Sequence, residues 1–456
     1  MNGEYEIFRT FAPMMIQLPK EFIHTTKQLM GEARFERYLQ SFEEEVPVSI
    51  RLNPLKVDGG WQIADSGEAV PWCRNAYYLK RRPNFTFDPL FHAGCYYVQE
   101  AASMFLDEVI RQTPSNSPEG GECLADSEAR RPSSPSGRPG GVLDLCAAPG
   151  GKSTLLRAAL PADCVLYSNE PIRNRASILL ENVTKWGYDN HHVTNLYPKD
   201  YRKSKMKFDL ILCDVPCSGE GMFRKDEATI KEWSPQNVEK CWQLQRDIVS
   251  EAWQCLNEGG IMIYSTCTFN TKENEENIRW MLSEFDAEVL PIETKPEWNI
   301  VGSLLPDFHE PVYRFIPGIT RSEGLFMCVL RKQMRNEKGE MRKDKGGMRN
   351  AAASSFSKNI LSLDHLHSSF LIPHSSFKID LSYAQAMAYL RHEALVLPPD
   401  TPRGVVEVCF MGHPLGLVKN IGNRANNLYP KEWRIKTTHV PQEYEPVIRP
   451  IEGLSE

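Results

Sequence analysis

The stretch "DLCAAPGGKST", residues 144–154, is the most informative segment for the fold, and it follows an apolar run that looks like a buried strand. It contains an acid at the strand end, a turn of small residues and a helix start in immediate succession. Small residues let the backbone approach a ligand closely, so this order predicts a ligand-binding turn between a strand and a helix. Its Gly-Gly-Lys-Ser end also matches half of a nucleotide triphosphatase signature.

The triphosphatase interpretation fails when the whole signature is tested. A phosphate-binding loop ending in Gly151-Lys152-Ser153 requires a glycine at position 146, where this chain has Cys146. Pro149 also stiffens the turn. The dinucleotide fingerprint G-x-G-x-x-G fails as well, because Gly150 and Gly151 are adjacent.

A carboxylate at the end of the next predicted strand points to a nucleoside ligand. Glu170 lies twenty positions after Gly150, in the segment "LYSNE". An acid in this place can accept hydrogen bonds from the two ribose hydroxyls of an adenosine group. A nucleoside cofactor without a long phosphate chain is therefore expected, and S-adenosylmethionine fits better than ATP or NAD.

Strand-like and helical segments alternate through the middle of the chain, with a long helix predicted over 235–256. This alternation predicts an α/β fold, a parallel sheet with helices on both faces and ligands at the carboxyl ends of its strands. The expected strands are 141–147, 164–170, 191–195, 209–216 and 260–267.

Two cysteines follow the fourth and fifth of these strands, Cys217 in "CDVPCSGEGMFRKD" and Cys267 in "YSTCTFN". Both should enter the cofactor cleft beside Asp214. A zinc site is a poor alternative, since two thiolates without a nearby pair of histidines make a weak ligand set. A redox-active disulfide is the stronger alternative, although the two cysteines of such pairs are usually separated by two residues in the sequence.

A cysteine beside a methyl-donor pocket suggests chemistry at C5 of a pyrimidine, a carbon that is too weak a nucleophile to take a methyl group directly. Addition of a thiolate to C6 makes C5 reactive, and loss of the C5 proton later expels the thiolate. Asp214 is the candidate acid at N3. The base must leave its stack, which is easiest in single-stranded or bulged RNA.

The bulk composition is that of an ordinary soluble protein. Twelve cysteines are spread over 456 residues without a C-x-x-C pair, so most are expected to be buried thiols, and no metal site is expected. No apolar run is long enough to span a membrane and no secretory signal opens the chain, so a cytoplasmic location is expected. The net charge of −6 leaves room for a local basic groove.

The segments around the sheet predict further domains. Residues 113–140 are rich in Pro, Ser and Gly, which predicts a disordered insertion. Residues 331–350 have eight Lys or Arg against three Asp or Glu; a solvated linker is the preferred interpretation, and an RNA-gripping tail the alternative. The predicted division is an N-terminal domain over 1–90, a catalytic domain over 91–332, a linker over 333–378 and a β-rich domain over 379–456.

Three blocks together resemble the Sun/Fmu-type RNA cytosine-C5 methyltransferases, namely "LDLCAAPGGKST", "DVPCSGEGMFRKD" and "GGIMIYSTCTFNTKENEENI". The tail "GHPLGLVKNIGNRANNLYPKEWR" is similar to the PUA-like module of the bacterial 16S rRNA methyltransferase F subgroup. The resemblance implies a Rossmann-like class I methyltransferase sheet, a small N-terminal α+β domain of RNA-binding type and a C-terminal PUA-like RNA-binding domain.

The resemblance also implies roles for individual residues. Cys267 would be the nucleophile and Cys217 would assist release of the methylated RNA, a ranking that the chemistry of the residues alone leaves open. Lys152 would approach the target base, and Asn195 is the expected contact after the third strand. The residues implied in S-adenosylmethionine binding are Cys146, Ala147, Ala148, Pro149, Gly150, Gly151, Lys152, Glu170, Asn195 and Asp214.

The leading hypothesis is an enzyme that methylates C5 of a cytosine in structured RNA, with 16S rRNA as the expected substrate. The same chemistry on tRNA is an alternative. A non-catalytic RNA-binding assembly factor is another, and the two cysteines with Asp214 argue against it.

Overall fold

The computed structural model describes residues 5–7, 17–113, 141–334, 377–437 and 439–451. The predicted insertion over 113–140 and linker over 333–378 lie almost entirely outside the described residues. The other domain boundaries stay predictions.

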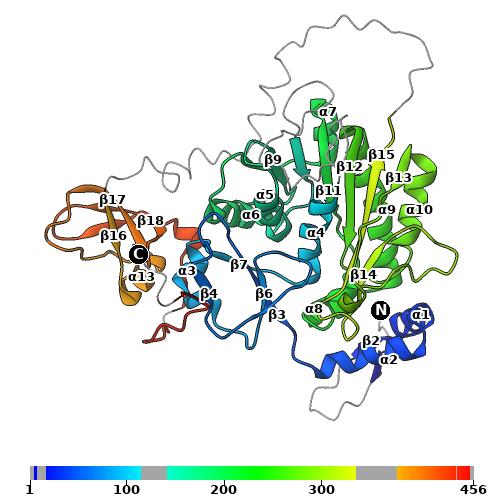
Figure 1. Cartoon of the computed structure of the whole chain (residues 1–456), viewed down its shortest axis with the longest axis horizontal. Helices are drawn as coiled ribbons and strands as arrows, with labels where there is room; N and C mark the ends of the chain where they lie inside the picture. The colour runs from blue at the N-terminus through cyan, green and yellow to red at the C-terminus, as the bar shows by residue number, and fades with distance from the viewer. Residues whose placement is uncertain (1–4, 8–16, 114–140, 335–376, 438, 452–456) are drawn as a thin grey trace, which may run out of the picture.

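A central sheet of eight strands forms the middle of the molecule (Figure 1). Its order is β10-β9-β8-β11-β12-β15-β13, with β14 paired to β15. The first five strands are parallel, whereas β15 runs antiparallel to β12. The strands are β8 (Gly141–Asp144), β9 (Val165–Asn169), β10 (His191–Thr194), β11 (Phe208–Asp214), β12 (Leu256–Thr266), β13 (Ala287–Val289), β14 (Tyr313–Phe315) and β15 (Leu325–Lys332).

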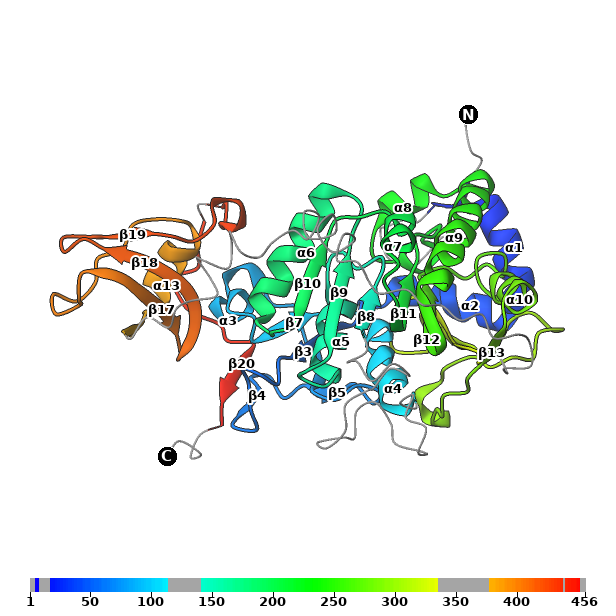
Figure 2. The ribbon, with the colours of Figure 1, turned by 90° about the horizontal axis from the view of Figure 1, so that it is seen from above.

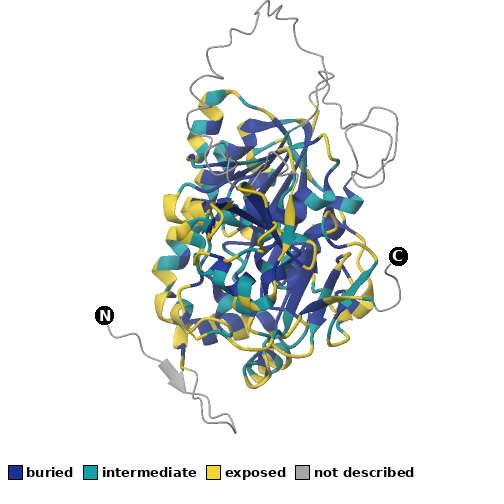
Figure 3. Ribbon diagram, turned by 90° about the vertical axis from the view of Figure 1, so that its left-hand side faces the viewer, coloured by how far each residue is buried: buried dark blue, intermediate teal, exposed yellow. Residues whose placement is uncertain are grey.

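Helices cover both faces of this sheet because successive side chains of each strand point to opposite faces. Leu210 and Leu212 of β11 pack with α4 and α5, whereas Ile211 and Cys213 pack with α7, α9 and α10. The buried residues accordingly run through the strands in the interior (Figure 3). The helices are α4 (Phe105–Gln112), α5 (Gly151–Ala159), α6 (Arg173–Trp186), α7 (Pro198–Ser204), α8 (Glu227–Glu232), α9 (Pro235–Cys255) and α10 (Glu275–Glu284).

The N-terminal segment contributes two helices and a small antiparallel sheet of order β5-β6-β3-β7. Phe22 and Phe35 of the helices share a core with Phe223 and Phe269, which lie in the loops after β11 and β12. The elements are β1 (Tyr5–Ile7), β2 (Gln17–Pro19), α1 (Lys20–Met30), α2 (Glu32–Gln40), β3 (Val48–Leu52), β4 (Trp61–Ile63), β5 (Glu68–Ala69), β6 (Ala76–Leu79), α3 (Pro89–His92) and β7 (Tyr96–Val98).

The C-terminal segment forms a four-stranded sheet, β16-β17-β18-β19, and returns to the N-terminal segment through β20. Ile448 of β20 pairs with Ile63 of β4, and the two strands lie side by side in Figure 2. One hydrophobic core contains Ile50 and Leu90 together with Leu390 and Val418. The elements are β16 (Lys378–Asp380), α13 (Tyr383–Leu390), β17 (Gly404–Phe410), β18 (His413–Asn420), β19 (Ala425–Asn427) and β20 (Ile448–Pro450).

The predicted α/β fold class is confirmed. All five predicted strands form in a parallel sheet, and the predicted helix over 235–256 is α9. Within the described part of the chain, no helix is long and apolar enough to cross a membrane.

Candidate active site

The small-residue turn lies where the sequence predicts it, between β8 and α5. Gly150 caps the helix with φ of +117°, a left-handed backbone conformation that L side chains rarely adopt. A Cβ at this position would lie 3.2 Å from Cδ1 of Leu179. Backbone conformation and space therefore both favour glycine at Gly150.

Asp144, at the end of β8, is fully buried behind this turn. Its Oδ2 accepts a hydrogen bond of 2.5 Å from the Ser153 hydroxyl, which fixes the first turn of α5. Its Oδ1 has no hydrogen-bond partner among the described residues. Burial raises the pKa of Asp144 to about 7, against the Ser153 hydrogen bond, which lowers it.

Lys152 connects this turn to the end of β11. Its Nζ lies 2.8 Å from Oδ2 of Asp214, and the Ser265 hydroxyl donates to Oδ1 of Asp214 at 2.6 Å. Asp214 and Ser265 are register partners on β11 and β12. Burial disfavours the charge on Lys152, but the Asp214 carboxylate outweighs it and the pKa of Lys152 is raised. Lys152 is therefore a cation whose position is fixed by its ion pair with Asp214.

The two predicted cysteines come together at the ends of β11 and β12. The Sγ atoms of Cys217 and Cys267 lie 3.1 Å apart, and the backbone N–H of Cys267 points at the Cys217 sulfur at 3.3 Å. Both residues are half-buried. The hydrogen bond with Cys267, followed by burial, raises the pKa of Cys217 well above its ordinary value. The two sulfurs therefore form one pair at the strand ends, and which of them acts as the nucleophile stays a prediction.

Glu170 and Asn195 also meet at the strand ends. The Asn195 amide donates to the Glu170 carbonyl at 2.6 Å, and the Glu170 carboxylate accepts from the Ile172 N–H at 2.9 Å. Arg175 lies 3.4 Å from the same carboxylate. The side chain of Glu170 is buried, and the predicted cofactor contacts of both residues stay predictions.

The rest of the predicted loop lies at the same edge of the sheet. Cys146 is half-buried, and burial raises the pKa of its thiol well above the ordinary value. Ala147 and Gly150 are buried, whereas Pro149 is exposed. The structure therefore brings all the predicted site residues to one end of the parallel strands.

Three polar residues of the cysteine loops were missed as site residues in the sequence. Glu220, Asn270 and Glu273 form hydrogen bonds between the loop of Cys217 and the loop of Cys267. Their positions directly after two adjacent strand ends were the available signal. Buried carboxylates need partners, and only the fold shows which backbone groups supply them.

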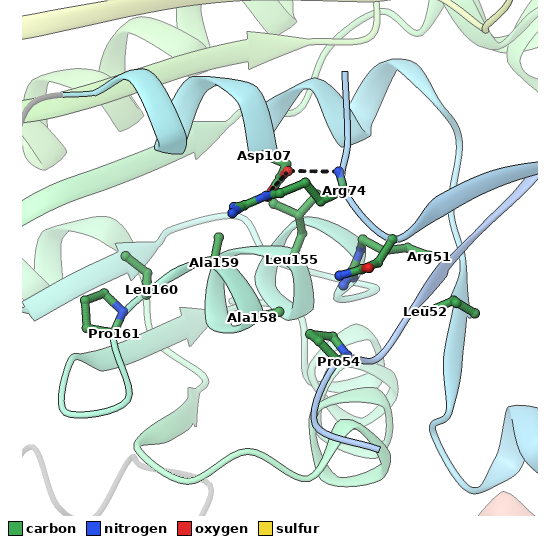
Figure 4. A pocket seen from close by; sticks show the side chains of 11 residues that line it. Arg51, Leu52, Pro54, Arg74, Asp107, Leu155, Ala158, Ala159, Leu160 and Pro161 are labelled. Carbon is green, nitrogen blue, oxygen red and sulfur yellow. Dashed lines mark hydrogen bonds and ion pairs between the residues drawn. The ribbon is translucent and has the colours of Figure 1, made fainter. Parts of the chain in front are cut away.

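A cavity of about 330 Å³ lies elsewhere, along α5 toward its C-terminal end (Figure 4). Arg51 in its wall donates to the Thr154 hydroxyl at 2.7 Å and to the Gly151 carbonyl at 3.3 Å, so β3 supports the start of α5. The wall includes none of the predicted site residues. It is formed by Arg51, Leu52, Pro54, Arg74, Asn75, Asp107, Leu155, Ala158, Ala159, Leu160 and Pro161.

The cysteine pair is not part of a larger set of metal ligands. Over the described ranges of the chain, no group of three or more His, Cys, Asp or Glu is arranged to hold a metal ion.

Models of one protein family match three parts of the chain in order. The N-terminal domain of 16S rRNA methyltransferase RsmF matches residues 18–101, the 16S rRNA methyltransferase RsmB/F model matches 137–331, and the RsmF PUA domain matches 376–435.

Curated relatives agree with these matches. Ribosomal RNA small subunit methyltransferase F of Pectobacterium atrosepticum is 30% identical over 333 residues, with 69% of this chain and 63% of the relative covered. The protein of the same name from Shigella flexneri serotype 5b is 27% identical over 500 residues, with 92% and 97% covered. The chain thus matches less than two thirds of the length of the Pectobacterium relative.

Solved structures share the fold. A methyltransferase homolog protein from Pyrococcus horikoshii superposes with a TM-score of 0.52 at 25% identity, covering 69% of this chain and 100% of that one. The structure of NSun6 from Pyrococcus horikoshii with SFG superposes with a TM-score of 0.53 at 18% identity, covering 70% and 99%.

The sheet order, the small-residue turn after β8 and the acid after β9 define a Rossmann-like class I methyltransferase fold. The chain belongs to the RsmB/F family of 16S rRNA methyltransferases, and it has the N-terminal and PUA domains described for RsmF.

Proposed function

We propose that this protein is an S-adenosylmethionine-dependent methyltransferase that methylates C5 of a cytosine in 16S rRNA. The observation that carries the proposal is the 3.1 Å pair of Cys217 and Cys267, beside the ion pair of Lys152 and Asp214. The family and the names of the curated relatives support ribosomal RNA as the substrate. Because ribosomal RNA is the proposed substrate, the enzyme is proposed to act in the cytoplasm.

The chemistry of the donor groups fits the cofactor. S-adenosylmethionine carries a positive charge on its sulfonium and its amino group, and it supplies an electrophilic methyl group. Asp144 has a buried oxygen without a partner, and Glu170 has a carboxylate at the next strand end. The residues from Cys146 to Lys152, with Glu170, Asn195 and Asp214, would hold the cofactor.

Cys267 is proposed to attack C6 of the cytosine, a role that the likeness of its segment to the family's motif supports. A bond forms between Sγ of Cys267 and C6, and the electron pair released to the ring is stabilised at N3. Asp214 is proposed to hydrogen-bond or protonate N3 in its protonated form, and the proton would pass to it from the Lys152 ammonium group, whose Nζ lies 2.8 Å from Oδ2 of Asp214.

Cys217 is proposed to act in the second half of the reaction. After the methyl group is on C5, a base must remove the C5 proton so that the ring electrons expel the Cys267 thiolate. Cys217 lies within contact distance of the sulfur that leaves, which supports its role in releasing the RNA. The C-terminal domain over 379–456 is proposed to bind RNA while this occurs.

Replacement of each cysteine tests the proposal. Cys217→Ala should accumulate a covalent protein–RNA species on denaturing gels, and Cys267→Ala should form none and transfer no methyl group. Labelled cofactor with purified 16S rRNA, assembled 30S subunits and tRNA separates the substrates. Methylation of tRNA alone would overturn the rRNA assignment. Binding of RNA without methyl transfer or adduct would indicate a non-catalytic assembly factor.

A further inference from the structure

A carboxylate from the Cys217 loop holds the backbone of the Cys267 loop. Glu220 lies three residues after Cys217 and is only 2% exposed. Its Oε2 accepts hydrogen bonds of 2.8 Å from the backbone N–H groups of both Phe269 and Asn270. Its Oε1 accepts from the indole N–H of Trp233 at 2.9 Å. The backbone just after the nucleophile is thus fixed by a side chain of the other loop.

A carboxylate from the Cys267 loop likewise binds the backbone of the Cys217 loop. Oε2 of Glu273 accepts from the backbone N–H of Ser218, the residue next to Cys217, at 3.1 Å. The same oxygen accepts from the side-chain amide of Gln245 at 2.6 Å. Glu273 is fully buried. Glu220, which follows Cys217, therefore binds backbone N–H groups in the Cys267 loop. Glu273, which follows Cys267, binds a backbone N–H group in the Cys217 loop.

Asn270 joins the two carboxylates. Its Nδ2 donates to Oε1 of Glu220 at 3.2 Å and to Oε1 of Glu273 at 2.8 Å. A direct backbone hydrogen bond, from the N–H of Gly221 to the Cys267 carbonyl at 2.8 Å, adds a further link between the loops. Glu220, Asn270 and Glu273 are called the carboxylate clamp below.

We infer that the carboxylate clamp is a positioning device that sets the distance between Cys217 and Cys267. The inference rests on the proposed function, because the distance matters only if both sulfurs act on one base. Adduct formation needs Cys267 alone, whereas release needs both sulfurs in place. Misplacement by about 1 Å can slow a reaction by about 10²-fold, so loosening the clamp should slow release more than adduct formation.

Glu220→Gln is the sharpest perturbation because it keeps the volume of the side chain. All four groups that face the Glu220 carboxylate are donors: the N–H groups of Phe269 and Asn270, the Trp233 indole and the Asn270 amide. The amide of glutamine would place its own N–H₂ against two of these donors, so at least one pair loses its acceptor.

The experiment follows one round of reaction with wild type, Glu220→Gln and Asn270→Ala on purified 16S rRNA with labelled cofactor. Asn270→Ala removes the bridging amide, together with the oxygen that accepts from the Glu273 backbone N–H at 2.9 Å, and it covers the case in which the glutamine variant folds poorly. Glu108→Gln on α4 is the matched control, because Glu108 is also a buried carboxylate that accepts from two side chains, those of Arg111 and Gln112. Cofactor affinity and thermal unfolding are measured for each protein.

The clamp variants should lengthen the lifetime of the covalent protein–RNA species at least 10-fold, with cofactor affinity within about 2-fold of wild type. Glu108→Gln should keep the wild-type lifetime. Wild-type adduct lifetimes in both clamp variants, or the same change in Glu108→Gln, would overturn the clamp. A wild-type protein that forms no adduct and transfers no methyl group would instead overturn the proposed function, and the clamp with it.

Discussion

The sulfur of Cys217 lies 3.1 Å from the sulfur of Cys267, although fifty positions separate the two residues in the chain. The contact exists because β11 and β12 are parallel neighbours, with Asp214 paired to Ser265 one step before the loops begin. Two half-buried thiols this close can share a hydrogen bond, in which either sulfur can be the donor.

The same closeness predicts sensitivity to oxidants. Treatment with hydrogen peroxide should join Cys217 and Cys267 in a disulfide, oxidising two thiols while the peroxide is reduced to two molecules of water. Activity should be lost and then restored by dithiothreitol, and intact mass should show the loss of two hydrogens. Cys217→Ser should show no reversible loss of these hydrogens. Persistence of both free thiols in inactivated wild type would contradict the prediction.

Lys152→Met should lower the rate of methyl transfer by about 10²–10³-fold, the range for loss of one placed charge in an active site. The reason is that Nζ holds the Asp214 carboxylate at 2.8 Å, and methionine has no donor to replace it. Single-turnover transfer to 16S rRNA measures the effect, and Lys152→Arg should recover part of the rate. A transfer rate in Lys152→Met equal to wild type would remove Lys152 from the mechanism.

Gly150→Ala should weaken binding of S-adenosylmethionine by about 10-fold or more. A side chain at φ of +117° costs about 1–3 kcal/mol, and the new Cβ would press on Leu179. Calorimetric titration with the cofactor measures the affinity.

Gly31→Ala is the control for that change, since Gly31 also has positive φ, at +76°, but lies between α1 and α2 with open space around it. It should lower the midpoint of thermal unfolding and leave cofactor affinity unchanged. Equal loss of affinity in both variants would show that the effect is general backbone strain.

Asp144→Asn should change how stability depends on pH. The pKa of Asp144 is raised from 3.8 to about 7, so the folded protein binds more protons than the unfolded chain between these values. Its contribution to stability is therefore lost as pH rises from about 4 to about 7 and is constant above that. The asparagine variant, which does not titrate there, should gain up to about 4 kcal/mol over wild type across this window.

Urea unfolding of both proteins at a series of pH values measures the difference in free energy. The difference should grow with pH and then level off above about pH 7. A difference that is the same at every pH would contradict the raised pKa.

The sequence carried enough information to predict the five parallel strands and to place the predicted site residues at their carboxyl ends. Each parallel strand is a short apolar run with a polar residue at its carboxyl end, so strand ends and site residues could be predicted together. The pairing of β11 with β12, which brings Cys217 to Cys267, followed from the usual arrangement of such sheets.

Contacts between distant segments could not be predicted in the same way. β15 is an apolar run like its neighbours, and nothing in its residues says that it enters the sheet antiparallel. The partners of Glu220 and Glu273 are backbone groups, which every residue carries, so no residue type marks them. The pairing of β4 with β20 joins segments almost four hundred residues apart, and no pattern in either segment marks the other as its partner.

The strand pair β4–β20 and the shared core around Ile50 and Val418 join the C-terminal sheet to the N-terminal sheet. These contacts limit how far the C-terminal sheet can move relative to Cys267. If RNA contacts both the C-terminal sheet and Cys267, the cytosine that is methylated would be selected by its distance from the part of the RNA that the C-terminal sheet binds.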